Sequence, residues 1–422
     1  MHLQPDCVLT SKGFVKGLGV TIQDGRILGV QTSPPVGHEI VQMPNRAIMP
    51  GFINSHSHVF QRALRGLTES HSPGQVDANF WSWRGQMYAL VAALCPEHVQ
   101  IIAQQAYTEM LLAGYTTVKE FHYLHHAPQG DPYDNPHEMA HRIIAAAQDT
   151  GIAIHLLRVA YPNVDTPAQR RFADRDMEQA LSRTDDLSSS THVPVGIAPH
   201  SIRAVPPEGF RESAIWARSK QAECHAHVSE QPREIAWCLD QYGRRPLALI
   251  GEMGGLDCDF TGVHLTHLDP AEIHDAGSHH VTACICPTTE GNLGDGVPAT
   301  RELLEAGASV AIGSDSQAEI DPFAEIRLLE YNERNRLGER RVLDPTRLLT
   351  SVCETTAPGS PARLLVLDRN HPALLGVPAE HLSGALVMGG RPSCIEQVWL
   401  GNQPVQPVAP VREYLQVLET IL

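Results

Sequence analysis

The stretch AIMPGFINSHSH, residues 47–58, predicts a strand whose apolar residues give way to two histidines at its end. Seven further short apolar runs follow along the chain: YTTVKEF, GIAIHLLRVAY, VPVGIAPH, AECHAHV, TGVHLTHL, HHVTACICP and ASVAIGSDS. Strands that are apolar throughout are typical of a parallel sheet covered on both faces. Helical patterns separate or follow them near residues 96–113, 137–149, 207–220, 231–242, 270–276, 299–306 and 322–336. These eight units favour an α/β fold, a TIM-like (β/α)8 barrel, over an open sheet.

The two ends of the chain have a different pattern. Residues 8–44 contain short strand patterns divided by a turn at Gln23-Asp24-Gly25, and residues 363–412 repeat that style. We therefore expect one composite β-sandwich domain, formed by residues 1–48 and 357–422. The barrel, residues 49–356, would be inserted between its two parts.

Composition and charge limit the class of protein. The chain has 422 residues, 42 % of them apolar, which is enough to bury a large core. Its formal net charge of -16 argues against a general basic face for nucleic acid or an anionic membrane. Charged residues interrupt the start where a signal peptide would be apolar, and no apolar run approaches the ~20 residues of a membrane span. We expect a cytoplasmic protein, with Cys284 and Cys286 on one face of a buried strand.

The 23 histidines prompt a search for a metal site. Polar side chains gather where the predicted strands end: His56, His58, Glu120, His200, His227, His264 and Asp315. In a (β/α)8 barrel, the carboxyl ends of the strands carry the active site. His56 and His58 are two residues apart, so both imidazoles can lie on one face of a strand and point into the barrel mouth. His225 and His227 form a second such pair.

Three imidazoles and a carboxylate, with water completing the set, suit a catalytic Zn²⁺ site with an open position. Zinc lowers the pKa of bound water to roughly 7 and so supplies hydroxide at neutral pH. Asp315, which closes the eighth strand, could take the proton of that water. Glu230, three residues after His227, could then move a proton to a leaving nitrogen. The pattern therefore predicts metal-assisted hydrolysis.

These motifs resemble the amidohydrolase superfamily. The resemblance lies in PGFINSHSH, in HAHVSE, in the histidine of the sixth strand and in the Ser-Asp of IGSDS, in an order that covers nearly the whole chain. A second metal in this superfamily usually needs a carboxylated lysine on the fourth strand. VPVGIAPH contains no lysine, and Lys119 belongs to the second strand, so one metal ion per chain is implied. Asn54, where hydrolase members often have aspartate, is similar to the deaminase branch.

Within the superfamily, the chain resembles the formimidoylglutamate deiminases of histidine degradation. The motifs are HSHVFQRALRG, FWSWRGQMY, EFHYLHH, APHSIRAV, HAHVSEQPREI and CPTTE with the following LGDG. This resemblance implies zinc ligands at His56, His58, His227 and Asp315, and a structural role for His225. It assigns proton transfer and water orientation to Glu230 and His264. It also implies that five residues hold the substrate: Gln61, Arg84, Tyr123, His200 and Arg203.

The implied reaction converts N-formimino-L-glutamate, a small dicarboxylate, and water into N-formyl-L-glutamate and ammonia. Two arginines suit two carboxylates, since each planar guanidinium can bind one bidentately. Arg84 is expected in a long loop after the first strand, and Arg203 just past the fourth. His122, His125 and His126 are expected in a loop without substrate contact. The chain departs from the family pattern at residues 291–297, GNLGDGV, and at 358–368, where Arg363 takes the place of an aspartate.

Two alternatives remain at this point. One is an amidohydrolase-fold deaminase of a heterocycle, of the guanine type, against which the two arginines argue because a neutral ring needs no pair of cations. The other is a non-catalytic barrel, against which the intact ligand set and Glu230 argue. The glycines near residues 251–255 follow a helix rather than a strand, so they do not indicate a dinucleotide site. We expect a homodimer without a nucleic-acid or membrane partner.

Overall fold

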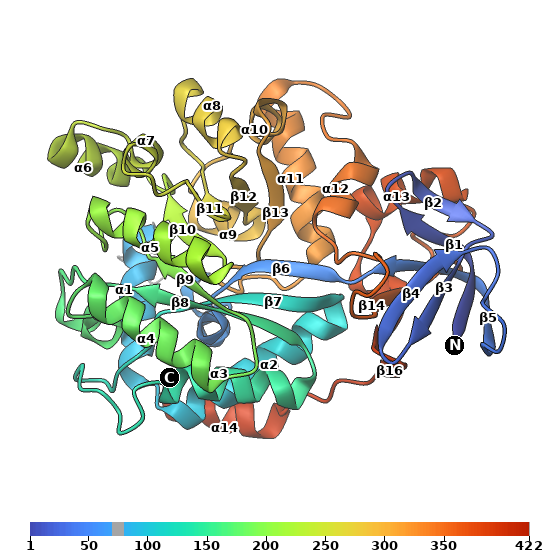
Figure 1. The fold of residues 1–422 in the computed structure, drawn as a ribbon, viewed down its shortest axis with the longest axis horizontal. Helices are drawn as coiled ribbons and strands as arrows, with labels where there is room; N and C mark the ends of the chain where they lie inside the picture. Colours follow the sequence, from blue (N-terminus) through green and yellow to red (C-terminus); the bar gives the residue numbers. More distant parts are fainter. Residues whose placement is uncertain (70–79, 422) are drawn as a thin grey trace.

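A computed structural model describes residues 1–69 and 80–421. One of its two eight-stranded sheets is hydrogen-bonded in the order β13-β12-β11-β10-β9-β8-β7-β6, with every neighbouring pair parallel. An isolated parallel bridge between Ser57 and Asp315 brings the two edge strands together. The sheet is thus a nearly closed barrel, as predicted (Figure 1). Its strands are β6 (Phe52–Ser57), β7 (Tyr115–His122), β8 (Ala153–Ala160), β9 (Val195–Pro199), β10 (Cys224–Val228), β11 (Phe260–His264), β12 (Thr282–Ile285) and β13 (Ser309–Ile312).

The stretch 47–58 is not one strand. Its first residues end β5 (Ile40–Pro50), which belongs to the second sheet, and β6 begins at Phe52. Gly51 stands between them, and a Cβ there would lie 2.1 Å from Thr116 Oγ1. Only glycine therefore lets the chain turn from one sheet into the other at this point.

Helices cover the barrel between its strands (Figure 1). Helices occur near all seven predicted positions: α2 (Pro96–Ala113), α3 (Glu138–Thr150), α5 (Pro207–Lys220), α6 (Pro232–Tyr242), α8 (Pro270–Ser278), α10 (Thr300–Ala306) and α11 (Pro322–Leu337). Many of them begin with proline at the first helical position, where its missing N–H costs no hydrogen bond.

Several helices were not predicted. Within the barrel part of the chain they are α1 (Phe80–Ala93), α4 (Met177–Ser190), α7 (Pro246–Glu252), α9 (Pro287–Leu293) and α12 (Pro345–Ser351). In α4 only Met177, Ala180, Thr184 and Leu187 are buried, a stripe too narrow and too polar to be recognised as amphipathic.

The second sheet is mixed and takes strands from both ends of the chain, as predicted for the β domain. Its order is β16-β15-β14-β5-β1-β3-β4, with β2 paired to β1. The expected turn at Asp24-Gly25 is present: both residues have positive φ, 50° and 74°, which suits a two-residue hairpin between β3 and β4. The remaining strands are β1 (His2–Thr10), β2 (Gly13–Lys16), β3 (Gly19–Gln23), β4 (Arg26–Gln31), β14 (Arg363–Asp368), β15 (Ile395–Leu400) and β16 (Gln403–Val405).

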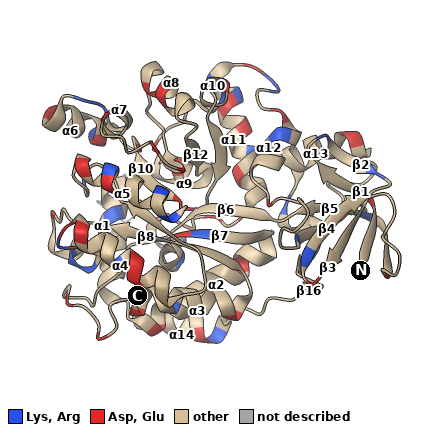
Figure 2. Cartoon of the chain, viewed as in Figure 1, with Lys and Arg blue, Asp and Glu red and all other residues tan. Residues whose placement is uncertain are grey.

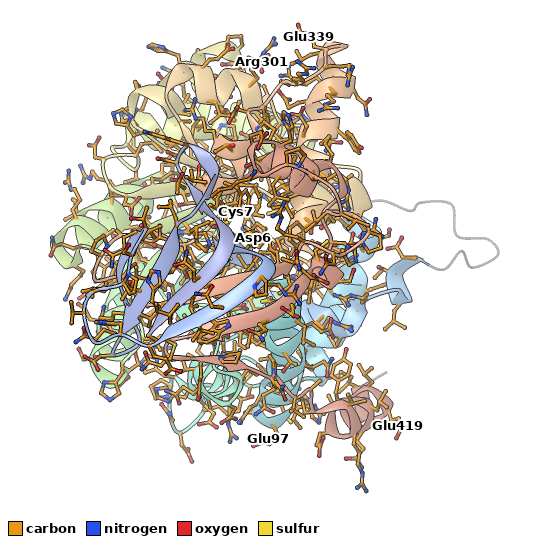
Figure 3. The ribbon with its side chains drawn as sticks, turned by 90° about the vertical axis from the view of Figure 1, so that its right-hand side faces the viewer. Asp6, Cys7, Glu97, Arg301, Glu339 and Glu419 are labelled. Atoms are coloured by element: carbon orange, nitrogen blue, oxygen red, sulfur yellow. The ribbon has the colours of Figure 1, made fainter. Side chains whose placement is uncertain are left out.

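Ion pairs tie the ends of the chain together. Figure 3 views the molecule from the side of the second sheet, with Asp6 on β1 facing the reader. Asp6 Oδ2 accepts a hydrogen bond from Arg369 Nη1 at 2.8 Å. Arg363 donates to Glu354 Oε1 and to Thr117 Oγ1 on β7, both at 3.0 Å. The departure from the family pattern at Arg363 thus creates a link between the second sheet and the barrel.

The C-terminal segment returns to the barrel. Helix α13 (Leu382–Gly389) packs against α11 and α12, and the last helix, α14 (Val411–Ile421), lies against α2 (Figure 1). Arg62 Nη1 donates to Tyr414 Oη on α14 at 3.2 Å. Among residues 1–69 and 80–421, none of the helices has the length and apolarity needed to cross a membrane.

Candidate metal centre and active-site cavity

A cavity of about 310 Å³ opens where the barrel strands end. The cavity is lined by the candidate ligand Asp315 and by nine other residues predicted for the site: His58, Gln61, Arg84, Tyr123, His200, Arg203, His227, Glu230 and His264. His56 is fully buried beside His58 and His227. The structure therefore brings together the residues predicted as metal ligands, catalytic groups and substrate contacts.

Four of these side chains form a group that could hold a metal ion: His56, His58, His227 and Asp315. The three histidine Nε2 atoms lie 3.1–3.3 Å from each other. Asp315 Oδ1 lies 3.3 Å from His56 Nε2 and 3.4 Å from His58 Nε2. Four ligands placed tetrahedrally about 2.1 Å from one Zn²⁺ would be about 3.4 Å apart. The donor atoms thus have the spacing of a four-ligand metal site.

The opposite ring nitrogens orient two of the imidazoles. His58 Nδ1 and His227 Nδ1 each lie 3.1 Å from a backbone carbonyl oxygen, of Phe121 and His200 respectively. Donation to these carbonyls leaves Nε2 unprotonated and free to bind a metal. Burial lowers the pKa of His58 to about 3, so this imidazole is neutral at neutral pH. Burial opposes ionisation of Asp315, but the neighbouring His56 holds the pKa of its carboxyl well below the usual value.

A buried hydrogen-bond network lies behind these ligands. Asn54 and Ser314 bond twice, through Nδ2 to Oγ at 2.7 Å and from the Ser314 N–H to Oδ1 at 3.0 Å. Ser314 Oγ donates to Gln317 Oε1 at 2.8 Å, and Gln317 Nε2 donates to Ser57 Oγ at 3.0 Å. Ser57 in turn donates to Glu120 Oε2 at 2.6 Å. The network joins the segment that carries His56 and His58 to the segment that carries Asp315.

Glu230 and His264 lie beside the metal-binding group. His264 Nε2 is 3.8 Å from Glu230 Oε1 and 3.7 Å from Asp315 Oδ2. Burial raises the pKa of the Glu230 carboxyl. Burial alone would lower the pKa of His264, but Glu230 and the other carboxylates around it raise that pKa well above its ordinary value. Both groups are therefore suited to carry a proton near neutral pH.

Comparison with known proteins decides the family. The family model described as "Amidohydrolase family" matches residues 47–358. The chain belongs to the amidohydrolase family. It is 33 % identical to a formimidoylglutamate deiminase of Pseudomonas aeruginosa, over 94 % of this chain and 92 % of that protein.

Solved structures share the whole fold. An amidohydrolase from Brucella melitensis has a TM-score of 0.89 at 29 % identity, covering 100 % of this chain and 99 % of that one. An adenosine deaminase from Xanthomonas campestris with bound zinc has a TM-score of 0.84 at 21 % identity, covering 100 % and 98 %. With its His₃Asp group, the chain is a metal-binding amidohydrolase of the deaminase type.

The sequence expectation for Arg84 in this amidohydrolase is wrong. Arg84 lies in helix α1 and not in a loop, although residues 70–79 of that expected loop fall outside the described residues. The sequence hides the helix because only Phe80, Met87, Leu90 and Val91 are buried along it. Tertiary contacts hold it instead: Tyr88 Oη accepts from Arg84 Nε at 2.7 Å and from Gln169 Nε2 at 3.1 Å. A helix fixes the position of Arg84 more firmly than a loop would.

The cavity also contains residues that sequence reasoning missed. Glu234 is buried, its Oε2 accepts from the Glu230 N–H at 3.1 Å, and burial raises its pKa to about 7 against the opposing effect of Arg203. Arg233 places its guanidinium 4.5 Å from the ring centre of Trp81, across the mouth of the cavity. The motif HAHVSEQPREI contains both residues, but nothing in their spacing separates them from ordinary first-turn residues of a helix.

The other histidines singled out in the sequence do not line the cavity. His122 is the last residue of strand β7, so the expectation of a loop is wrong for it, whereas His125 and His126 follow the strand; all three are buried. His225 Nε2 lies 3.2 Å from Glu223 Oε2 inside the barrel, in agreement with a structural role. Cys284 and Cys286 are buried, free cysteines at β12, as expected.

Proposed function

We propose that this amidohydrolase is a zinc-dependent deiminase that converts N-formimino-L-glutamate and water into N-formyl-L-glutamate and ammonia, a step of histidine degradation. The observation that carries the proposal is a single cavity that combines the His₃Asp group with two arginines, Arg84 and Arg203. The similarity to a formimidoylglutamate deiminase over 94 % of the chain supports the same substrate.

The donor set supports one zinc ion per chain. Three neutral imidazoles and one carboxylate at tetrahedral spacing match the ligands that zinc prefers in catalytic sites. When bound, zinc lowers the pKa of water to roughly 7 and so supplies hydroxide at neutral pH. His56, His58, His227 and Asp315 would hold it.

The chain's own residues carry the proton transfers. Asp315 accepts a proton from the attacking water, and His264 Nε2 orients that water and stabilises the oxygen as negative charge develops on it. Glu230, whose pKa is raised by burial, gives a proton to the terminal nitrogen, and the hydroxyl proton of the adduct follows to the same nitrogen, which leaves as ammonia. The proton taken up by Asp315 then passes to Glu230 and restores both groups. The carbon of the formimino group gains a C–O bond and loses its bond to the terminal nitrogen, so the balance requires only water.

Two arginines in the cavity lining suit a dicarboxylate. Arg84 and Arg203 come from different elements and can each meet one carboxylate. Burial works against the charge of Arg203, but Glu234 and Glu230 nearby raise its pKa, so the guanidinium stays charged. Gln61 Nε2 donates to Tyr123 Oη at 2.9 Å, and His200 lies beside Tyr123 with ring centres 5.8 Å apart. These three side chains line the cavity beside the metal-binding group and can hold the middle of the substrate.

Ammonia release tests the proposal. Zinc-loaded enzyme should release one ammonia per N-formimino-L-glutamate consumed, and Glu230→Gln should abolish release while it retains the metal. Glu97→Gln, on the outer surface of α2, is the matched control and should behave as wild type. No release from this substrate, together with turnover of a heterocycle such as guanine or adenosine, would contradict the substrate assignment. No turnover of either kind would favour a non-catalytic barrel. The homodimer and the cytoplasmic location stay predictions, to be checked by sedimentation and cell fractionation.

A further inference from the structure

A buried carboxylate stands behind His264, on the side away from the metal-binding group. Glu290 Oε1 lies 3.3 Å from His264 Nδ1, and both side chains are about 1 % exposed or less. Neither the sequence motifs nor the proposed proton transfers assign Glu290 a role. A fully buried carboxyl needs partners to offset the loss of its hydration, and the imidazole N–H is one of the two that it has here.

The second partner explains why Glu290 is held in place. Glu290 Oε1 also accepts the backbone N–H of Cys286 at 2.9 Å. Cys286 is the N-cap residue of α9, whose first residue is Pro287, so Glu290 is the fourth helical residue and its side chain reaches back to the backbone of the N-cap residue. This hydrogen bond fixes the side chain against its own helix. The carboxylate thus lies on a rigid support.

The backbone of His264 is itself held in an unusual conformation. His264 has φ +72° and Leu265 has φ +51°, in the left-handed region that residues with a side chain rarely adopt. The Leu265 N–H donates to Val228 O at 3.1 Å and stabilises this turn at the end of β11. Backbone strain of this kind collects at functional sites, where the direction of a side chain has to be imposed. Here it aims Nε2 into the cavity and Nδ1 at Glu290.

We propose that Glu290 is a positioning residue for the reaction, which accepts the Nδ1–H of His264 and thereby fixes the orientation of the imidazole ring with Nε2 in the cavity. The inference rests on the proposed function, because it assigns a partner to the histidine that orients the attacking water. In that orientation Nε2 is the ring nitrogen that faces Glu230 Oε1 and Asp315 Oδ2, at 3.8 and 3.7 Å. A ring flip would place a carbon atom there and lose both contacts.

The same residues also form, with the Cys286 thiol, a group of three that could hold a metal ion. The two arrangements exclude each other, since a metal at Nδ1 would replace the proton that Glu290 accepts. The observed Nδ1–Oε1 separation, and the use of the same Oε1 by the Cys286 N–H, favour the hydrogen bond. Metal stoichiometry distinguishes them.

Steady-state kinetics on the zinc-loaded enzyme provide the first test, with N-formimino-L-glutamate or, if that fails, whichever substrate releases ammonia. Glu290→Ala should lower kcat about 10- to 100-fold, as loss of a carboxylate behind a functional histidine generally does, and change KM less than threefold. Glu290→Gln keeps an acceptor oxygen and should recover most of the lost kcat. The matched control is Glu325→Ala. It removes a buried carboxylate on α11 that accepts the backbone N–H of Thr288, in the first turn of α9, at 3.0 Å. A similar kcat for the Glu290→Ala and Glu325→Ala variants would overturn the proposal.

Two measurements that do not depend on turnover complete the test. The ¹⁵N NMR spectrum of the metal-loaded protein should contain a signal for the Nδ1–H of His264, which is assigned by its loss in His264→Gln. This proton should be protected from exchange in wild type and in Glu325→Ala. Its signal should be lost in Glu290→Ala. Retention of that signal in Glu290→Ala would refute the hydrogen bond. Metal analysis should give one equivalent in all variants. Two equivalents in wild type and one in Glu290→Ala would make Glu290 a metal ligand and overturn the positioning role. Because the NMR experiment needs no substrate, it stands even if the proposed substrate is wrong.

Discussion

Replacing Gln317 by leucine should weaken metal binding although Gln317 touches no metal ligand side chain. Gln317 makes three buried hydrogen bonds: it donates to Ser57 Oγ at 3.0 Å and to Asp315 O at 2.8 Å, and it accepts from Ser314 Oγ at 2.8 Å. Ser57 lies between two candidate ligands in the chain, and Asp315 is another. Leucine removes all three bonds while it preserves an apolar side chain of similar length.

The structure limits the size of the effect. Ser57 keeps its bond to Glu120, and Asp315 O still accepts the His58 N–H at 3.0 Å, so no group is left entirely without a partner except the Ser314 hydroxyl proton. Three bonds at a net ~1 kcal/mol each give a loss of about 3 kcal/mol in the free energy of unfolding. Loss of a partner behind metal ligands typically lowers metal affinity about 10- to 100-fold, which is about 1.4–2.7 kcal/mol.

Urea unfolding with and without zinc separates the two effects. A ligand that binds only the folded state stabilises it by RT ln(1 + [L]/Kd). The difference in the free energy of unfolding between wild type and Gln317→Leu should therefore increase by about 1.4–2.7 kcal/mol in excess zinc. Gln105→Leu is the control, because Gln105 is a buried glutamine on α2 that bonds Glu109 at 2.7 Å, away from the metal-binding group. The difference in unfolding free energy between Gln105→Leu and wild type should be the same with and without zinc. An equally constant difference for Gln317→Leu would refute the claim that the network organises the ligands.

Three further predictions concern the cavity, the metal and the buried histidines. Arg203→Ala should raise KM about 10- to 100-fold and leave the metal content unchanged, because the lost contact is a charged hydrogen bond to substrate; loss of metal would show that the residue is misplaced. Removal of the metal by a chelator should abolish ammonia release and lower the unfolding free energy, and zinc should restore both; full activity of metal-free enzyme would exclude the mechanism. Burial and the nearby Arg158 lower the pKa of His122 to about 3, below the ~6.5 of an unfolded chain, so stability should fall as the pH drops from 6.5 towards 3. In urea titrations, His122→Leu should reduce the dependence of the unfolding free energy on pH by up to ~1.4 kcal/mol per pH unit. An unchanged pH dependence would contradict the lowered pKa of His122.

The barrel and the metal-binding group could be predicted from the sequence because both depend on short-range patterns. The i, i+2 spacing of His56 and His58 and the position of His227 at the end of an apolar run are visible without a partner. The break at Gly51 is different, since apolar residues lie on both sides of it, and only the approach of Thr116 shows why the strand has to end there.

Long-range contacts explain what could not be predicted. Asn54 and Ser314 are 260 residues apart in the chain, so no spacing rule connects them, yet they form the centre of the network behind the ligands. Helix α1 places Arg84 in the cavity, and the hydrogen bond between Tyr88 and Gln169, which are 81 residues apart in the chain, holds the helix there. Glu290 is an ordinary first-turn residue of a helix until β11 places an imidazole against it. Each of these positions becomes functional only through the fold.

The net charge of -16 does not conflict with a dianionic substrate. In Figure 2, acidic and basic positions are interspersed over the outer helices. At physiological ionic strength exposed charges are screened within about 8 Å, so most of that excess acts weakly inside a cavity. Arg84 lies there with its guanidinium 5.3 Å from the Trp81 ring centre, and Arg203 lines the same cavity, near Glu230 and Glu234. The charge that a small dicarboxylate meets is therefore set by a few buried groups, and the overall charge of the chain only limits the large polyanions that it can bind.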